Sequence, residues 1–273
     1  MPPMLARVRM LFYAKSPVAI PPTLASATGN MALTAAILGV LLGLCLPGVC
    51  TLLSAAGRAA AHLYTYGTPP TPRAPQSASA RIVGAPQLHM YLAAWSVFHL
   101  LEFLVTAYWN APHLRSDSFL LQNGAMYAAA HIFGLLEFAL EMALFAPLKC
   151  SVLAQVAGLC FVAVGQVLRS FAMVHASTNF SHAMAEKKRE SHMLVKTGVY
   201  AYVRHPSYVG FFYWALGTQI LLCNPIGFIL FALALRAFFA DRIRREEQLL
   251  HQFFGASYAQ YASTVPAGVP FVT

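Results

Sequence analysis

Charged residues are scarce in this sequence. Its 273 residues include 18 lysine and arginine side chains and nine aspartate and glutamate side chains, together 10% of the chain. A typical soluble domain carries about 25% charged residues, so this composition does not supply the charged surface of a water-soluble protein. Hydrophobic residues make up 58% of the chain, which excludes intrinsic disorder. The composition therefore predicts a multi-spanning membrane protein.

Cysteine is also sparse, and its spacing excludes two common uses. The five cysteines are Cys45, Cys50, Cys150, Cys160 and Cys223, and no two of them form a CxxC pair. A zinc site needs clustered ligands, and a disulfide scaffold has a dense and usually even set. We therefore expect these cysteines to be small apolar packing residues, and we expect no metal site.

Acidic residues are outnumbered, and the formal net charge is +9. In a soluble protein such an excess of basic residues indicates a nucleic-acid partner. In a membrane protein, basic residues gather in loops on the cytosolic side, so topology alone explains the excess. We accordingly expect no binding of nucleic acid.

Apolar runs suited to membrane helices recur along the sequence. Crossing the hydrocarbon core takes about 20 largely apolar residues per helix. Asn224 and Pro225 form a turn signal between the last two runs, which predicts a tight helical hairpin. We predict an all-α, polytopic transmembrane helical bundle with about six spans, at 31–53, 87–109, 119–145, 150–174, 209–222 and 226–240.

Polar stretches divide the chain into regions. A loop at 69–81, rich in Pro, Ser, Thr and Ala, closes an N-terminal segment (1–86) that contains the first span and a weak amphipathic stretch at 5–20. The remainder (87–273) forms the membrane core. We predict that this core contains a polar loop at 176–210, the helical hairpin at 209–240 and a tail with a C-terminal helix at 241–273.

The hairpin places the polar loop and the tail on one side of the membrane. Twelve lysine and arginine residues fall on that side and four on the other. Because basic residues concentrate on the cytosolic side, we predict that the loop and the tail face the cytosol. Three basic residues within 7–15 surround no adequate apolar core, so we expect no cleavable signal peptide.

Charged side chains inside predicted spans are costly, and those of Glu102, Glu137, Glu141 and Arg169 need a reason. Glu137 and Glu141 are four residues apart and share a helix face, and Glu102 lies in the second span. Interhelical ion pairs that hold the bundle explain these glutamates as well as a functional role does. Arg169 lies near a cytosolic end, where it either snorkels to the interface or faces a cavity that holds an anion.

Several short segments in the last third of the chain share one similarity. The segments are NFSH at 179–182, LVKTGVY at 194–200, RHPSYVG at 204–210, GTQILLCNP at 217–225, REE at 245–247 and VPAGVPF at 265–271. Together they resemble the isoprenylcysteine carboxyl methyltransferases, over about residues 90–273. RHPxYxG alone is shared with phospholipid N-methyltransferases and sterol reductases, whereas NFSH and VPxGxPF are more particular to the carboxyl methyltransferases.

The resemblance implies a multi-pass enzyme of the endoplasmic reticulum membrane with its active site towards the cytosol. It implies transfer of a methyl group from S-adenosylmethionine to the α-carboxylate of a C-terminal prenylated cysteine, left after CaaX proteins are processed. The implied partners are these prenylated proteins and membrane lipid. A carboxylate with a pKa of about 3.3–3.7 is already ionised at pH 7, so this reaction needs neither a metal nor a general base.

The resemblance also carries site residues over by position. Arg242 matches the family arginine that engages the substrate, and Arg169 is our second candidate, since an arginine fork can hold a carboxylate. The expected cofactor contacts are His192, Met193, Leu194, Val195, Tyr200, His205, Pro206, Ser207, Tyr208 and Glu246.

Three alternatives remain open at this point. A phospholipid N-methyltransferase has the same cofactor loop, but its amine substrate needs a base and no arginine. A sterol reductase needs a nicotinamide site, and the sequence has no separate phosphate-binding glycine pattern. A non-enzymatic membrane scaffold leaves the polar loop unexplained.

Overall fold

The computed structural model describes residues 22–66, 77–121, 124–182, 184–188, 190–270 and 272, and the amphipathic stretch expected at 5–20 lies outside these ranges. The described residues form helices and turns without a strand, which confirms the all-α fold class. The α-helices are α2 (Pro22–Tyr66), α3 (Ala78–Val83), α4 (Pro86–Trp109), α5 (Ala125–Leu144), α6 (Val152–Ala176), α7 (Pro206–Leu221), α8 (Pro225–Phe254) and α9 (Ala256–Thr264). The 3₁₀ turns are η1 (Ala111–His113), η2 (Ser116–Phe119), η3 (Ala146–Lys149), η4 (Ser177–Asn179) and η5 (Gly198–Ala201).

Membrane-length helices account for most of the bundle. α7 and α8 form the predicted hairpin, but α7 has only 16 residues, a length of about 24 Å against a hydrocarbon core of about 30 Å. The number of six spans therefore stays a prediction, whereas the membrane helical bundle is confirmed. Four segments are long and apolar enough to cross a membrane: Thr28–Cys50, Pro86–Trp109, Ala125–Leu144 and Val152–Asn179.

The predicted start of the third span, at 119, is wrong. The chain there forms η2 and then turns at Leu120, whose φ of 55° lies in the left-handed region. α5 begins only at Ala125, after Gly124 with a φ of 90°. Glycine adopts this conformation without the steric cost that a side chain would impose, so the break fixes the true start of α5.

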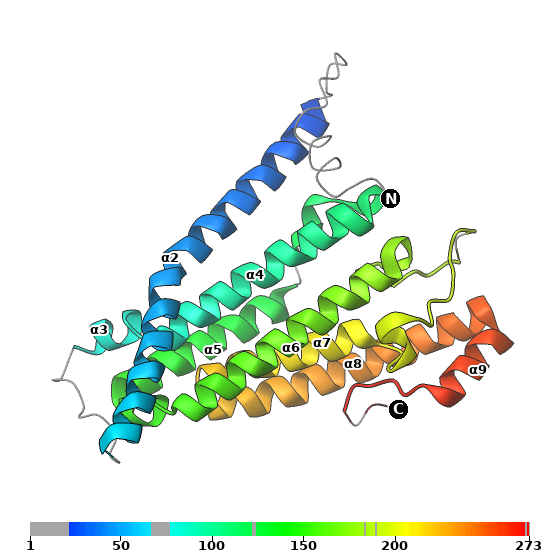
Figure 1. Cartoon of the computed structure of the whole chain (residues 1–273). Helices are drawn as coiled ribbons and strands as arrows, with labels where there is room; N and C mark the ends of the chain where they lie inside the picture. Colours follow the sequence, from blue (N-terminus) through cyan, green and yellow to red (C-terminus); the bar gives the residue numbers. More distant parts are fainter. Residues whose placement is uncertain are drawn as a thin grey trace.

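The second helix of the hairpin extends beyond the predicted apolar run, which ends at 240. α8 continues without a break to Phe254, so the sixth apolar run and the start of the tail form one helix of 30 residues. Figure 1 shows this helix reaching from the hairpin turn to the end of the bundle where α9 lies. The charged residues after 240 therefore lie on the same continuous helix as the apolar run before them.

α6 and α7 pack at backbone contact because glycines face each other across the pair. A Cβ atom at Gly165 would lie 2.4 Å from the backbone nitrogen of Trp214, and one at Gly210 would lie 2.7 Å from the backbone nitrogen of Arg169. A Cβ atom at Gly158 or Gly217 would lie similarly close to the backbone of the facing helix, nearer the hairpin turn. Close packing through small residues is typical of membrane helices, and here it sets Arg169 directly beside the start of α7.

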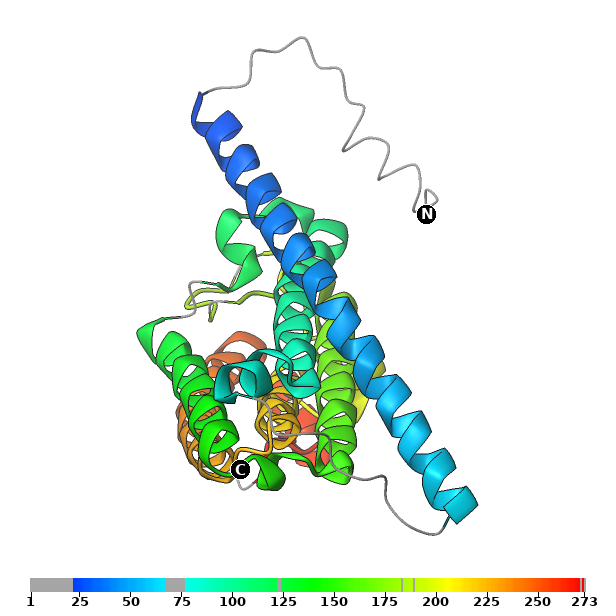
Figure 2. The same ribbon diagram turned by 90° about the vertical axis from the view of Figure 1, so that its left-hand side faces the viewer.

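α2 lies across the outside of the bundle. Figure 2 shows it running diagonally over α4, the helix against which it packs. A Cβ atom at Gly48 would lie 2.3 Å from the ring of His89, so the glycine permits this contact. α2 thus covers one side of α4, and the later helices form the rest of the bundle.

Glu137 caps the second helix of the hairpin. Its carboxylate accepts the backbone N–H groups of Ile226 at 2.9 Å and Gly227 at 2.7 Å. The first N–H groups of a helix have no partner within the helix, so this intraspan acid satisfies donors that would otherwise be buried and unpaired.

Lys149 binds the C-terminal end of α7, the first helix of the hairpin. Its ammonium group is fully buried, pairs with Glu141, and donates to the carbonyl of Cys223 at 2.8 Å and to Asn224 Oδ1 at 2.7 Å. Carbonyl groups at a helix end attract a cation. Two of the three intraspan glutamates therefore have structural partners at the hairpin turn.

Candidate functional site

A cavity of about 210 Å³ opens at the end of the bundle opposite the hairpin turn. Its wall combines the loop after α6, the first turn of α7 and the second half of α8, which meet at the α9 end of the molecule in Figure 1. A second cavity of about 110 Å³ shares several wall residues with it and lies against the end of α8. Together the two volumes fall at the lower end of the range of about 300 to 1,000 Å³ that is common for small-molecule sites.

The structure brings the residues predicted for the cofactor to these cavities. His192 lines the smaller cavity and not the larger one, while Met193, Tyr208 and Glu246 line both. The residues that line the larger cavity include Met193, Leu194, Val195, Tyr200, His205, Pro206, Ser207, Tyr208 and Glu246, and also both candidate arginines, Arg169 and Arg242.

His205 lies between two adjacent glutamates of α8. Its Nε2 is 2.8 Å from Glu247 Oε1, and its Nδ1 is 3.6 Å from Glu246 Oε2. Burial disfavours the charged imidazole, but the two carboxylates outweigh this effect and raise the pKa of His205 above its ordinary value. The imidazole therefore links the start of α7 to α8.

One oxygen of Glu247 is approached by three hydrogen-bond donors. Arg204, His205 and Tyr258 all approach its Oε1, at 2.9, 2.8 and 2.8 Å. Burial opposes ionisation of this carboxyl, but the donors prevail and lower the pKa of Glu247 to about 2. The Oε1 atom is thus engaged within the chain, and these contacts fix the turn of α8 that carries Glu246.

Glu246 has a spare acceptor atom. Its Oε2 is buried and accepts no hydrogen bond from the described residues, and His205 Nδ1 lies beyond hydrogen-bond distance from it, at 3.6 Å. Burial favours the neutral acid, but the neighbouring His205 holds the pKa of Glu246 below its ordinary value, so the group is a carboxylate at neutral pH. Buried acceptors in proteins nearly always have a partner, so this oxygen indicates a position for a ligand donor.

The VPAGVPF segment explains how the RHP turn keeps its shape. The backbone N–H of Arg204 donates to the carbonyl of Pro266 at 2.9 Å, and that of His205 donates to Ala267 at 3.2 Å. The Arg204 guanidinium also donates to the carbonyls of Ala262, at 3.0 Å, and Val265. The end of the chain therefore supports the cavity wall from behind.

Arg242 projects from α8 into the larger cavity. Its Nε donates to the Tyr208 hydroxyl at 2.9 Å, and its Nη2 donates to the backbone carbonyl of His182 at 2.6 Å. Among the described residues no carboxylate forms an ion pair with Arg242. The guanidinium is thus oriented by neutral acceptors, and its charge is available to a ligand.

Arg169 has a different environment. Its guanidinium forms a two-point ion pair with Glu102, with Nη2 2.9 Å from Oε2, and its Nη1 donates to Ser207 Oγ at 2.9 Å. The side chain is buried, so it does not snorkel to the interface. Because its charge is already matched, the pairing disfavours Arg169 as the group that binds a substrate carboxylate.

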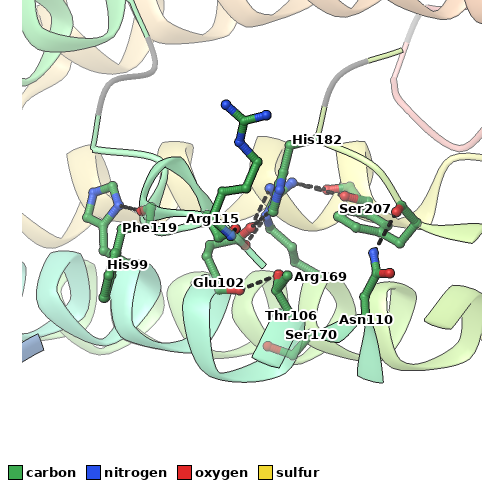
Figure 3. Close-up of polar contacts among 12 residues, drawn as sticks. His99, Glu102, Thr106, Asn110, Arg115, Phe119, Arg169, Ser170, His182 and Ser207 are labelled. Carbon is green, nitrogen blue, oxygen red and sulfur yellow. Dashed lines mark hydrogen bonds and ion pairs between the residues drawn. The ribbon is translucent and has the colours of Figure 1, made fainter. Parts of the chain in front are cut away.

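Glu102 and His182 are site residues to which the sequence assigned no role here. Figure 3 shows them pointing toward each other beside Arg169, and His182 Nε2 lies 2.9 Å from Glu102 Oε2. Asn110 supports the same segment by donating to the carbonyl of Phe180 at 2.8 Å. The NFSH pattern was the available signal, because it marked 179–182 without indicating what the segment contacts.

Comparison with known proteins gives one consistent result. The model of the isoprenylcysteine carboxyl methyltransferase (ICMT) family matches residues 157–252. The protein-S-isoprenylcysteine O-methyltransferase of Saccharomyces cerevisiae is 46% identical over 190 residues, which cover 67% of this chain and 80% of the yeast protein. The human protein of the same name is 46% identical over 182 residues, which cover 67% of this chain and 64% of that protein.

A solved structure agrees over nearly the whole chain. It is described as the eukaryotic intramembrane Ras methyltransferase ICMT without a monobody, and it superposes with a TM-score of 0.74 at 32% sequence identity. The match covers 97% of this chain and 81% of that one. This chain belongs to the isoprenylcysteine carboxyl methyltransferase family.

Proposed function

We propose that this protein transfers a methyl group from S-adenosylmethionine to the α-carboxylate of a C-terminal prenylated cysteine, producing a methyl ester. One observation carries the proposal beyond family membership. Arg242 presents a guanidinium without a close ion pair in the described chain to a cavity that Glu246, one turn further along α8, also lines with a buried oxygen that accepts no hydrogen bond. A carboxylate substrate and a cationic methyl donor require this pair of opposite charges.

The residues around the cavities fit S-adenosylmethionine. The spare buried oxygen of Glu246 suits the ammonium group of the donor, because a buried charge needs an opposite charge or a hydrogen-bond donor. The side chains of Met193, Leu194 and Val195 provide apolar surface for its adenosyl part. When bound, S-adenosylmethionine supplies a methyl group on a sulfonium, whose carbon–sulfur bond breaks with its electron pair remaining on sulfur.

Arg242 would bind and orient the substrate carboxylate. A guanidinium offers two parallel N–H donors with the spacing of a carboxylate. Tyr208 and the His182 carbonyl already fix the plane of Arg242, so less side-chain freedom is lost when the substrate binds. The arginine directs the carboxylate without removing its charge, so the oxygen remains nucleophilic.

The chain contributes alignment and exclusion of water to this reaction. A carboxylate attacking a methyl group requires the oxygen, carbon and sulfur atoms to lie nearly in line, and holding two reactants in such a geometry lowers the barrier substantially. His205 and Glu247 fix the two walls relative to each other. Aromatic side chains at the cavity, including Phe211, Phe238 and Phe239, limit access of water.

We further propose that the protein resides in the endoplasmic reticulum membrane with this cavity towards the cytosol. The predicted distribution of basic residues supports the orientation. Prenylated proteins meet the membrane from the cytosolic side, so a cavity on that side receives the substrate's carboxylate while the apolar chain stays in lipid. Farnesylated and geranylgeranylated peptides are both candidate substrates.

The test is a transfer assay with two acceptors. Purified protein in lipid vesicles receives S-adenosylmethionine with a radiolabelled methyl group and either N-acetyl-farnesylcysteine or phosphatidylethanolamine. We expect label in a base-labile ester of the prenylcysteine and none in the phospholipid. Label in phosphatidylethanolamine alone would support a phospholipid N-methyltransferase, and no transfer to either acceptor would refute both methyltransferase functions.

A further inference from the structure

We propose that Glu102 is a positioning residue for the carboxylate site and acts on Arg242 through His182. The inference rests on the proposed function, because it concerns how the cavity selects a carboxylate. Glu102 does not line the cavity, but both of its partners do. It is therefore placed to control the site from behind the wall.

Glu102 is held in a fixed position. Only 1% of its surface is exposed, and both of its oxygens are engaged by Arg169 from α6. The Arg169 guanidinium also lies 5.3 Å from the ring of Phe98 and 5.5 Å from that of Phe211, as measured from its central carbon. An arginine held on several sides holds its carboxylate partner in one place.

Glu102 contacts the NFSH segment through His182. His182 lies in a loop, and its ring is tied to Glu102 Oε2 at 2.9 Å, as Figure 3 shows. The same loop is anchored by Asn110, which donates to the Phe180 carbonyl, and by Asn179 Oδ1, which accepts the backbone N–H of Met193 at 2.8 Å. Of these anchors, the contact with Glu102 is the one made by the residue that contacts Arg242.

His182 in turn contacts Arg242. The backbone carbonyl of His182 accepts from Arg242 Nη2 at 2.6 Å, the shortest of the two contacts that orient this guanidinium. A shift of the His182 backbone would leave Arg242 with Tyr208 alone, and one hydrogen bond does not fix the plane of a guanidinium. Glu102 thus determines where the forked donor points.

Glu102→Gln tests the proposal by direct binding, with no turnover needed. The ligands are N-acetyl-farnesylcysteine, its methyl ester and S-adenosylhomocysteine, measured with purified protein in lipid nanodiscs. The matched control is Glu137→Gln, the same change at another buried span residue, which caps α8 at the opposite end of the bundle. The free acid reports on Arg242, the ester reports on the prenyl chain, and S-adenosylhomocysteine reports on the donor site.

We expect Glu102→Gln to weaken binding of the free acid by about tenfold or more, since a hydrogen bond to a charged group is lost or misdirected. Binding of the ester and of S-adenosylhomocysteine should change by less than about threefold, and Glu137→Gln should retain the preference for the acid. Equal losses for all three ligands would indicate a general structural role and overturn the proposal. An unchanged preference for the acid would also overturn it.

A second variant covers the case in which Glu102→Gln does not fold. His182→Leu removes the side chain that Glu102 holds while leaving the ion pair between Glu102 and Arg169 intact. It should lose the preference for the acid in the same way, and retention of that preference would contradict the proposal. If the wild-type protein binds neither acid nor ester, the proposed function fails, and that outcome is distinct from a failure of the role of Glu102.

Discussion

Arg169 Nη2 donates to Glu102 Oε2 over 2.9 Å and so joins α6 to α4 behind the cavity wall. The pair gives different environments to the two arginines that the sequence ranked first and second as candidates for binding the substrate carboxylate. Arg169 is matched by an acid, whereas Arg242 is oriented by a hydroxyl and a carbonyl and remains available. Burying a matched pair costs far less than burying a lone charge, which explains why a membrane bundle tolerates an arginine at this position.

The spare oxygen of Glu246 leads to a prediction about donor affinity. Glu246→Gln keeps the shape of the side chain but removes its charge, so the ammonium of the donor loses its partner. We expect the dissociation constant for S-adenosylhomocysteine to rise by about 10- to 100-fold, the range for a hydrogen bond between charged groups. Isothermal titration calorimetry with the purified protein measures this directly. Unchanged affinity would place the donor's amino group elsewhere.

Lys149 leads to a prediction about stability without an effect on ligands. Lys149→Met leaves Glu141 and the Asn224 oxygen without their cation at the hairpin turn. Removing one partner of a buried ion pair costs about 3–5 kcal/mol, so we expect a clearly lower unfolding temperature. S-adenosylhomocysteine should bind the folded variant with wild-type affinity. A large loss of affinity would show that the two ends of the bundle are coupled.

His205 leads to a prediction about pH. Its pKa is raised in the folded protein by Glu246 and Glu247 against the opposing effect of burial. A raised pKa means that the folded state binds the proton more tightly, so the stabilisation is complete below the unfolded pKa of about 6.5 and is lost as pH rises through the folded value.

The measurement is the difference in unfolding temperature between wild type and His205→Asn. The difference should be largest at about pH 6 and shrink towards about pH 9. The groups that face the imidazole are Glu246, Glu247 and the Tyr208 ring, and Arg204 shares Glu247 with it. A difference that grows with pH would contradict the charge assigned to His205.

Much of this architecture follows from the sequence, because long apolar runs have few stable arrangements in a membrane. The hairpin at Asn224 and the grouping of the RHPSYVG and REE segments agree with the pattern. The structure adds that α8 is continuous to Phe254, which the change from apolar to charged residues after 240 does not reveal, since helix propensity is high on both sides of that residue.

The pairing of the intraspan charges could not be predicted from the sequence. Glu102, Glu137 and Glu141 are equivalent by composition, and which of them meets Arg169 depends on the rotation and height of α4, α5 and α6. Contacts between α6 and α7 at Gly165 and Gly210 fix the height of Arg169 against α7. The role of VPAGVPF was likewise invisible, because its contacts with the RHP turn are made by backbone groups.

The most direct test of the central claim is methyl transfer by Arg242→Ala beside the wild type. Both proteins receive labelled S-adenosylmethionine and N-acetyl-farnesylcysteine in lipid vesicles, and binding of S-adenosylhomocysteine confirms that both are folded. The account predicts base-labile ester from the wild type, and a fall in kcat/KM for prenylcysteine by about 10- to 100-fold or more in the variant, with donor affinity within about threefold of the wild type. Equal ester formation by both proteins, or an equal loss of prenylcysteine turnover and donor binding, would contradict Arg242 as the group that holds the carboxylate.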